Sequence, residues 1–392
     1  MRRTLACLGS LSVVAGKTYF AETFDDSWET RWVKSEWKEE DGTAGEFELN
    51  TGKYFGDEKE DRGLKTLTDN RFYDISANFP PFDNGGKDII IQYQVKYDED
   101  IDCGGGYIKV GPMQEDNGKM FGDPTEYNIM FGPDRCGYQK RTHLIFTYRG
   151  NNVLKKHDMP YKQEVIGTSH LYRLTLYHNN TCKVDIDEAE VYRGELKEDW
   201  ELLKPKEIED PNDKKPEDWH DNPEMDDPLD KKPDGWVEER RIPDPTAVRP
   251  DDWDDEEDGD WEAPMMDNDA WKGEWAAKQI KNDQYIGVWE VKKIPNPEYF
   301  DDPELSKFDF GFIGIDLWQV KAGTIFDNII ITDEPAAADA FAAKWKALSS
   351  AEKEHLRIRD ENDKVLQDEK MHDADDPDED DDGEDEKTTE EL

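Results

Sequence analysis

The chain has 392 residues and a formal net charge of −46, with 96 acidic and 50 basic side chains. This charge repels phosphate backbones, so it argues against duplex nucleic acid as a partner and favours cations. Aromatic residues make up 11% of the chain, which excludes a wholly disordered acidic polymer. Residues 205–297 carry a net −16 and residues 351–392 a net −14, which predicts an acidic insert and an acidic tail beside a folded part.

The N-terminus has the pattern of a secretory signal peptide over residues 1–16. Arg2 and Arg3 precede a short apolar run, Leu5 to Val14, which ends in small residues. A buried N-terminal helix is the alternative interpretation. No other stretch approaches the 18 apolar residues of a membrane span, so we expect the mature chain to be soluble.

Removal of this segment takes away Cys7 and leaves Cys103, Cys136 and Cys182. A secretory compartment favours one disulfide and one free thiol among them. Cys103 and Cys136 both neighbour glycines in loop-like contexts, which favours that pair. Asn179 begins an Asn-Asn-Thr sequon and is a candidate glycosylation site.

Short β-rich segments run from residue 17 to about residue 204 and return over residues 298–350, after the insert. Gly- and Asp-rich turns separate them, and no helical pattern lies between them. This order predicts one antiparallel two-sheet β-sandwich, which the late strands rejoin. The clearest predicted strands are Ile89–Tyr97, Leu144–Tyr148, Leu171–Tyr177, Thr181–Ile186, Ala189–Tyr192, Phe308–Val320 and Thr324–Thr332.

The insert, residues 205–297, contains two repeats and holds 12 of the 21 prolines and 7 of the 13 Trp. One set of tryptophans is spaced by 17 residues, and a second set, each member following a Gly-x pair, by 14. A single unit is too small to bury a core, so we expect outgoing and returning units to pair as a hairpin arm. The expected pairs are Trp253 with Trp261, Trp236 with Trp275, and Trp219 with Trp289. The turn from Asp254 to Asp260 is intensely acidic, which suits either a solvated loop or a basic partner surface.

A helix is predicted from Pro335 to about residue 350. Its apolar positions recur at helical spacing and form a stripe that would dock on the sandwich: Ala338, Phe341, Ala342, Trp345 and Leu348. The acidic tail, residues 351–392, is expected to be disordered, most clearly where residues 373–392 contain 13 acidic side chains. The last four residues, Thr389-Glu390-Glu391-Leu392, are similar to the Lys-Asp-Glu-Leu retrieval signal of the endoplasmic reticulum, apart from the Thr.

These features resemble the calreticulin family, the soluble relatives of calnexin, over nearly the whole chain. The two repeat types are the family's hallmark, and three further blocks match it: Cys103–Lys109, Tyr127–Asp134 and Ile315–Asn328. The resemblance implies a legume-lectin-like sandwich and a monomeric, non-enzymatic lectin chaperone of the endoplasmic reticulum. Such a protein retains unfolded glycoproteins that bear monoglucosylated N-glycans, and it buffers Ca²⁺.

The resemblance also implies a sugar-binding set that includes polar, aromatic and apolar side chains. Carboxylates accept hydrogen bonds from hydroxyls, an ammonium donates, a phenol does both, and Trp and Met cover the C–H faces of a sugar. Taken alone, each position would be interpreted as an ordinary sheet-surface residue. The family's disulfide, Cys103–Cys136, would brace the sugar-binding set. The members of that set are Tyr107, Lys109, Tyr127, Met130, Asp134, Ile145, Asp316 and Trp318.

Calcium and a protein partner are further implications of the resemblance. A high-affinity site would use the carboxylate of Asp327 and the backbone carbonyls of Thr23, Glu60 and Arg62, because a hard cation requires oxygen ligands. In isolation, Asp327 would be interpreted as a turn residue. The acidic tail would bind Ca²⁺ weakly and in quantity. At the arm tip, the positions matching the family's dock for a thiol–disulfide oxidoreductase are Glu256, Asp258, Asp260 and Trp261.

Two other functions stay open at this point. A luminal calcium-storage protein without lectin activity would use the tail but leave the arm unexplained. A sandwich-fold glycoside hydrolase would need paired carboxylates, and the nearest clusters are Asp185-Ile186-Asp187-Glu188 and Glu46-Phe47-Glu48. The sequence has no Cys-x-x-Cys, no His-Glu-x-x-His and no phosphate-binding Gly-Lys loop. We therefore expect a binding protein rather than an enzyme.

Overall fold

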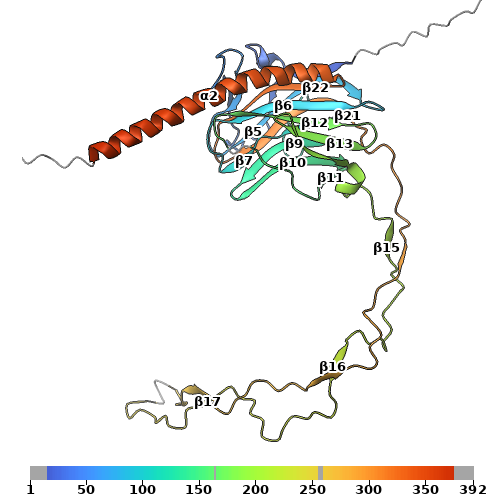
Figure 1. Ribbon diagram of the computed structural model, residues 1–392, viewed down its shortest axis with the longest axis vertical. Helices are drawn as coiled ribbons and strands as arrows, with labels where there is room; N and C mark the ends of the chain where they lie inside the picture. Colours follow the sequence, from blue (N-terminus) through green and yellow to red (C-terminus); the bar gives the residue numbers. More distant parts are fainter. Residues whose placement is uncertain (1–15, 163–164, 255–258, 375–392) are drawn as a thin grey trace, which may run out of the picture. The chain divides into compact units, whose positions relative to one another are not determined.

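The computed structural model describes residues 16–162, 165–254 and 259–374. The chain divides into two compact units, one formed by Met1–Lys204 with Phe300–Leu392 and the other by Pro205–Tyr299. We call the first the globular unit and the second the arm (Figure 1). The predicted signal peptide, apart from Gly16, and the chain's last 18 residues lie outside the described residues.

The globular unit is an antiparallel β-sandwich, as the sequence predicts. Its first sheet, which we call sheet A, has the strand order β14-β13-β12-β6-β22-β4-β3, with β1 added beside β22. The described strands of sheet A are β1 Thr18–Glu22, β3 Phe47–Asn50, β4 Gly63–Thr66, β6 Ile89–Tyr97, β12 Ser169–Leu176, β13 Thr181–Ile186, β14 Ala189–Glu195 and β22 Thr324–Thr332.

The second sheet, sheet B, has the order β11-β10-β9-β8-β21-β5-β2, with β7 added beside β9. In both sheets a late strand, β22 or β21, lies between early strands, so the segment after the arm completes the sandwich. The described strands of sheet B are β2 Val33–Lys34, β5 Arg71–Asp83, β7 Cys103–Gly105, β8 Ile108–Gly111, β9 Ile129–Cys136, β10 Gln139–Tyr148, β11 Asn151–Leu154 and β21 Asp309–Gln319. Two short helical segments, η1 Trp28–Thr30 and α1 Leu196–Asp199, complete the unit's loops.

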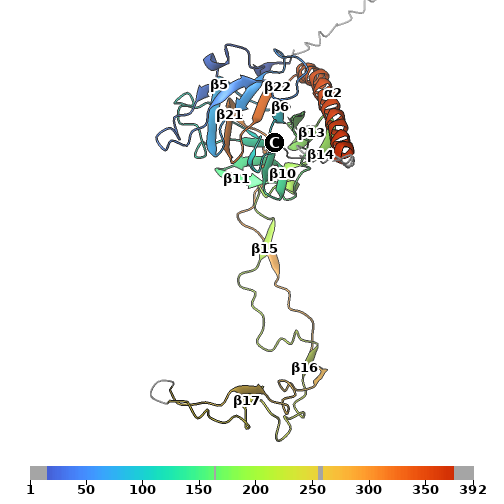
Figure 2. The same cartoon turned by 90° about the vertical axis from the view of Figure 1, so that its left-hand side faces the viewer.

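The side chains of strand β6 alternate between the two faces of sheet A. Tyr93 and its alternate neighbours along the strand enter the core between the sheets, because successive side chains point to opposite faces. Gln92 and Lys96 point the other way and are still buried, because helix α2, Pro335–Ala374, covers that face. Figure 2 shows α2 on the far side of the globular unit from β5 and β21. Helix α2 therefore covers the outer face of sheet A at β6, β12 and β22. The outer face of sheet B lies on the opposite side of the unit.

Helix α2 docks through one stripe, part of which the sequence predicts. Ala338, Ala342 and Trp345 are buried as expected, and Trp345 Nε1 donates to Ser169 Oγ at 3.1 Å. Lys96 and Glu352 form a buried ion pair, with Nζ and Oε1 2.7 Å apart, and Glu352 also accepts the backbone N–H of Ser169. Polar contacts thus extend the apolar stripe by two further turns.

The expected end of this helix at residue 350 is wrong, since α2 continues to Ala374. Half of residues 351–374 are Glu, Lys, Arg, Leu or Gln, which favour helix, and Arg357 pairs with Glu361 at the (i, i+4) spacing. The acidic composition pointed to disorder, but the local pairing of opposite charges favours helix over this range.

The arm is an antiparallel hairpin in which three short strand pairs alternate with tryptophan contacts. Outgoing β15 Glu207–Glu209, β16 Glu224–Asp226 and β17 Arg241–Pro243 pair with returning β20 Lys293–Pro295, β19 Gln279–Lys281 and β18 Met265–Asp267 respectively. The rings of Trp219 and Trp289 meet edge to face with centroids 4.8 Å apart.

A repeated hydrogen bond gives the Gly-x-Trp motif its physical reason. Trp219, Trp236 and Trp253 each donate Nε1–H to the carbonyl of the glycine two residues before the expected partner Trp, at 2.8–3.0 Å. Those glycines have φ between 79° and 105°, a region that side-chain-bearing residues avoid. The three hydrogen bonds confirm the register of the hairpin that the sequence predicts.

Candidate functional site

The eight predicted sugar-binding residues come together on the outer face of sheet B. Lys109 lies opposite Met130 in the β8–β9 ladder, and Met130 lies opposite Ile145 in the β9–β10 ladder. On the other side of β8, Lys109 lies opposite Gly314, two residues before Asp316 on β21. Because alternate residues of a strand share a face, Asp134 and Trp318 point to this same side.

An apolar cluster, separate from the core, supports this face. It contains Phe121, Tyr127, Met130, Ile145 and Phe312, with Tyr107 packed against it. Phe121 lies directly over Gly314, where an added Cβ would meet its ring at 2.3 Å. Glycine at this position lets an aromatic ring approach the strand beside Lys109 and Asp316.

The polar centre of the face is the ion pair between Lys109 and Asp316. The distance from Lys109 Nζ to Asp316 Oδ2 is 2.5 Å, and both residues are buried. The ammonium also lies 5.0 Å from the ring centroid of Tyr127. These contacts hold a charge-assisted donor and acceptor in one fixed geometry, and the remaining lone pairs of Asp316 are suited to a ligand hydroxyl.

Two tyrosines and Asp134 line the neighbouring part of the face. Burial raises the pKa of Tyr107, with the carboxylates of Asp316 and Asp134 adding to the effect. Burial likewise raises the pKa of Tyr127 to about 12. Both phenols therefore stay neutral and keep a hydrogen to donate. His143 Nε2 lies 3.2 Å from Asp134 Oδ2, which orients this carboxylate.

Trp318 provides the exposed apolar surface. It is 39% exposed, and its ring centroid lies 4.7 Å from that of Phe72 on β5. The ring centroid of Trp37 lies 5.9 Å from that of Phe72. An exposed aromatic surface of this kind can stack against the C–H face of a sugar.

The sequence interpretation missed three residues on this face: Phe72, Asp74 and His143. Asp74 lies directly opposite Asp316 in the β5–β21 ladder, and Phe72 lies opposite Trp318. Their alternation along β5 was a usable signal, but β5 was not predicted as a separate strand. His143 alternates with Ile145 on β10, whose predicted start fell one residue after it.

The predicted disulfide between Cys103 and Cys136 is present. The two cysteines lie opposite each other in the β7–β9 ladder. Two residues further along the same ladder, Gly105 lies opposite Asp134. The bridge therefore fixes the strand that carries Asp134 and the loop that leads to Tyr107. Cys182 is a buried free thiol, and burial raises its pKa to about 12.

The predicted calcium carboxylate, Asp327, lies at a bulge in β22 on sheet A. The β22–β6 register shifts between Asp327 and Ile330, and Asn328 has a φ of 48°. Thr23 follows Glu22, which lies opposite Ile329. Arg62 precedes Gly63, where an added Cβ would lie 3.0 Å from Asp327 Cβ. Thr23 and Arg62 thus adjoin strands that flank the bulge.

The surroundings of Asp327 disfavour an ionised carboxylate. Its Oδ1 is buried without a hydrogen-bond partner among the described residues, and Gln94 Nε2 is 3.4 Å from Oδ2. Burial raises its pKa well above the ordinary value, and the nearby carboxyls of Asp61 and Glu22 raise it further. Asp61 also has a buried Oδ1 without a partner in the described part of the chain. A cation with oxygen ligands fits this set.

Side chains alone do not complete a metal site here. Over the described ranges, no group of three or more His, Cys, Asp or Glu side chains is placed to hold a metal. The expected ligand set has a single side chain and three backbone carbonyls. The third of these, Glu60, belongs to the turn before β4, and its carboxylate pairs with Lys344 of α2 at 3.0 Å.

The arm tip is described only in part. Asp260 is exposed and Trp261 is half-buried, whereas Glu256 and Asp258 lie outside the described residues. Trp253 Nε1 donates to Gly259 O at 2.8 Å, which joins the outgoing and returning segments beside the tip.

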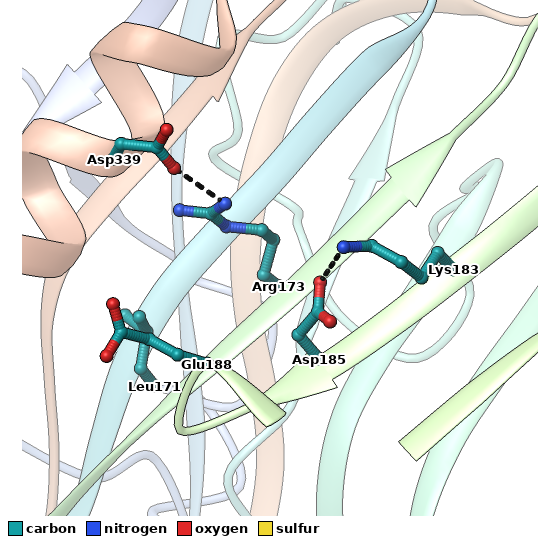
Figure 3. Close-up of a pocket in the computed structure, with 6 residues that line it drawn as sticks. All are labelled: Leu171, Arg173, Lys183, Asp185, Glu188 and Asp339. Carbon is teal, nitrogen blue, oxygen red and sulfur yellow. Dashed lines mark hydrogen bonds and ion pairs between the residues drawn. The ribbon is translucent and has the colours of Figure 1, made fainter. Parts of the chain in front are cut away.

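Four of the five carboxylates in the acidic clusters that suggested a hydrolase have a hydrogen-bond or ion-pair partner. Asp185 Oδ2 lies 2.7 Å from Lys183 Nζ, Asp187 lies 2.7 Å from His170, and Glu188 pairs with Lys346 of α2. Figure 3 shows the pocket here, in which Arg173 pairs with Asp339. Glu48 of the second cluster accepts a hydrogen bond from Asn50. These partners give the carboxylates structural roles.

Comparison with known proteins places the chain among well-described relatives. A sequence profile of the calreticulin family matches residues 20–259 and 256–331. Calreticulin of Chlamydomonas reinhardtii is 56% identical over 344 residues, which is 86% of this chain and 81% of that protein. Calreticulin of Homo sapiens is 53% identical over 362 residues, 91% of this chain and 85% of that protein. The solved globular domain of T. cruzi calreticulin aligns with a TM-score of 0.62 and 27% identity, over 88% of this chain and 99% of that chain.

Proposed function

The chain belongs to the calreticulin family, and from this premise we propose that it is a lectin chaperone that binds monoglucosylated N-glycans on unfolded glycoproteins. The observation that carries the proposal is the convergence of the eight predicted residues on the outer face of sheet B. Residues separated by more than 200 positions meet there as one set of donors, acceptors and apolar surface, with the Lys109–Asp316 pair at its centre.

The chemistry of this face suits a neutral sugar. A hexose presents adjacent hydroxyls, which need a fixed donor and acceptor side by side, and C–H faces, which need an aromatic or apolar surface. Lys109 and Asp316 provide the first, and Trp318 with Met130 the second. The net charge of −46 disfavours an anionic ligand on long-range grounds.

Calorimetric titration with a glucose-capped oligomannose tests the proposal. Wild type should bind it and should bind the uncapped oligomannose more weakly, whereas Asp316→Ala and Tyr107→Phe should weaken binding. Asp185→Ala removes a buried carboxylate from sheet A and is the matched control, which should bind as wild type does. A wild type that does not bind, or binding unchanged in both site variants, would reject the lectin function.

We propose in addition that Asp327, with the carbonyls of Thr23, Glu60 and Arg62, holds one tightly bound Ca²⁺. The support is the buried, unpartnered oxygen of Asp327 beside Asp61. A bound Ca²⁺ would supply the positive charge that these carboxyls lack.

The acidic tail is proposed to bind many Ca²⁺ ions weakly. A chain that ends at Ala374 should therefore bind fewer Ca²⁺ ions than the full chain. Equal numbers of bound Ca²⁺ ions in the two chains would reject the tail as the weak calcium-binding segment.

The arm tip is proposed as the docking surface for a basic domain of a thiol–disulfide oxidoreductase. Asp260 and Trp261 are the described members of that surface, and Glu256 and Asp258 the proposed remainder. Deletion of residues 254–260 should abolish recruitment of the partner, and undiminished recruitment would reject the tip as the dock.

The endoplasmic-reticulum lumen is the proposed location, because of the signal-like start, the sequence Thr389-Glu390-Glu391-Leu392 and the family. No helix in the described ranges is long and apolar enough to span a bilayer. Fluorescence microscopy of the chain with and without its last four residues tests retention.

A further inference from the structure

Asp74 is a buried carboxyl in the proposed sugar site, to which the sequence motifs give no role. It lies on β5 directly opposite Asp316 on β21, and the two residues are 7% and 6% exposed. Their side chains lie side by side on the same face of the sheet, because directly opposite residues of neighbouring strands are adjacent. Two buried carboxylates this close repel each other, so one of the two is held in its protonated form.

The charges around the pair explain where that proton belongs. Lys109 on β8 faces the pair and gives its hydrogen bond to Asp316 Oδ2, so Asp316 is the better stabilised anion. Lys38, in the segment after β2, is the other facing cation, and its ammonium lies over the rings of Trp37 and Phe72. Burial raises the pKa of Asp74, and the Asp316 carboxylate raises it further, whereas Lys109 and Lys38 lower it by less.

A neutral Asp74 has one carboxyl oxygen that can accept a hydrogen bond from a ligand. A protonated carboxyl donates through its O–H and still accepts through its other oxygen. Asp74 Oδ1 is buried and has no hydrogen-bond partner among the residues that the structure describes. A buried oxygen without a partner carries a desolvation cost, which a proton on Oδ1 that is donated to Asp316 would remove. The other oxygen, Oδ2, is then left to accept a hydrogen bond.

We propose that Asp74 is a further glycan-binding residue, which donates a hydrogen bond to Asp316 and accepts one, at Oδ2, from a hydroxyl next to the hydroxyl that Asp316 binds. This inference rests on the proposed glycan site. The ligand it describes is a neutral hexose with two adjacent free hydroxyls. Lys109 donates to one sugar oxygen, and Asp316 and Asp74 accept from neighbouring O–H groups.

Calorimetric titration of the full chain with a glucose-capped oligomannose, near pH 7, tests the assignment. Asp74→Asn keeps both a donor toward Asp316 and an acceptor toward the sugar, so its affinity should stay within about threefold of wild type. Asp74→Ala loses both and should bind about tenfold more weakly, the effect of one lost hydrogen bond. Asp185→Asn, which changes a buried carboxylate of sheet A, should bind as wild type does. Thermal melting of each variant checks that it is folded.

The pH profile separates this role from a merely structural one. As the pH rises to about 10, Asp74 ionises, stops donating and repels Asp316, so the affinity of wild type should fall about tenfold more than that of Asp74→Asn. A wild type that does not bind overturns both the proposed function and this inference. A wild type that binds, together with an equally strong Asp74→Ala or an identical alkaline fall in Asp74→Asn, overturns this inference alone.

Discussion

Replacement of Asp74 by Asn is expected to stabilise the globular unit by an amount that grows with pH. Burial, and then the neighbouring Asp316, raise the pKa of Asp74 from 3.8 to about 9 in the folded protein. The folded state therefore keeps a proton that the unfolded chain releases above about pH 4. The contribution of Asp74 to the stability of wild type is therefore greatest below that pH and falls as the pH rises toward about 9.

The size of the effect follows from the same linkage. Each pH unit inside this window costs wild type about 1.4 kcal/mol, because one pKa unit corresponds to that free energy. Asn has no proton to release, so the variant lacks this dependence. At pH 7, about three units above the unfolded pKa, the variant should be more stable by about 4 kcal/mol.

Urea unfolding, followed by tryptophan fluorescence at four values between about pH 5 and about pH 8, measures this difference. Asp69→Asn is the control, since a hydrogen bond from Lys321 lowers the pKa of Asp69. A lowered pKa gives stability that is lost only below about pH 4, so the control's difference from wild type should be constant over the range. A constant difference for Asp74→Asn as well would refute the assignment of a proton to this carboxyl.

Three further predictions concern the helix, the arm and the metal. Glu352→Ala should lower the free energy of unfolding in urea by about 3–5 kcal/mol, because it leaves Lys96 buried without a counter-charge. The double variant Lys96→Met with Glu352→Leu should be about as stable as wild type. A Glu352→Ala variant as stable as wild type would contradict this. Gly287→Ala should displace the indole N–H resonance of Trp219 without changing the melting of the globular unit, because alanine disfavours the φ of 105° that aims this carbonyl; an unmoved resonance would argue against the repeat's hydrogen bond. Ca²⁺ at about 100 times its Kd should stabilise wild type by about 2.7 kcal/mol and leave Asp327→Asn unchanged, as measured by thermal melting against a chelator; equal stabilisation of both would move the site elsewhere.

The sandwich and the arm could be predicted because their signals are local and periodic. Alternation along Ile89–Tyr97 marked a strand, and the Trp spacings of 17 and 14 fixed which units of the arm meet. Each outgoing Trp donates to a glycine of the returning unit, so the spacing itself encodes the register.

Features that depend on distant pairing could not be predicted in this way. Asp74 and Asp316 are 242 positions apart, and only the ladder between β5 and β21 brings them together. The burial of Glu352 depends on Lys96 in the same manner. In the C-terminal segment, composition indicated disorder, whereas opposite charges at helical spacing extend α2 to Ala374.

The outer face of sheet B is proposed to bind the glucose-capped end of an N-glycan. A crystal structure of the full chain with a glucose-capped oligomannose would show whether it does. We expect the terminal glucose to lie against Lys109 and Asp316, with its ring between Tyr107 and Trp318. Glycan density on another face of the molecule, or on this face with the glucose turned out to solvent, would contradict it.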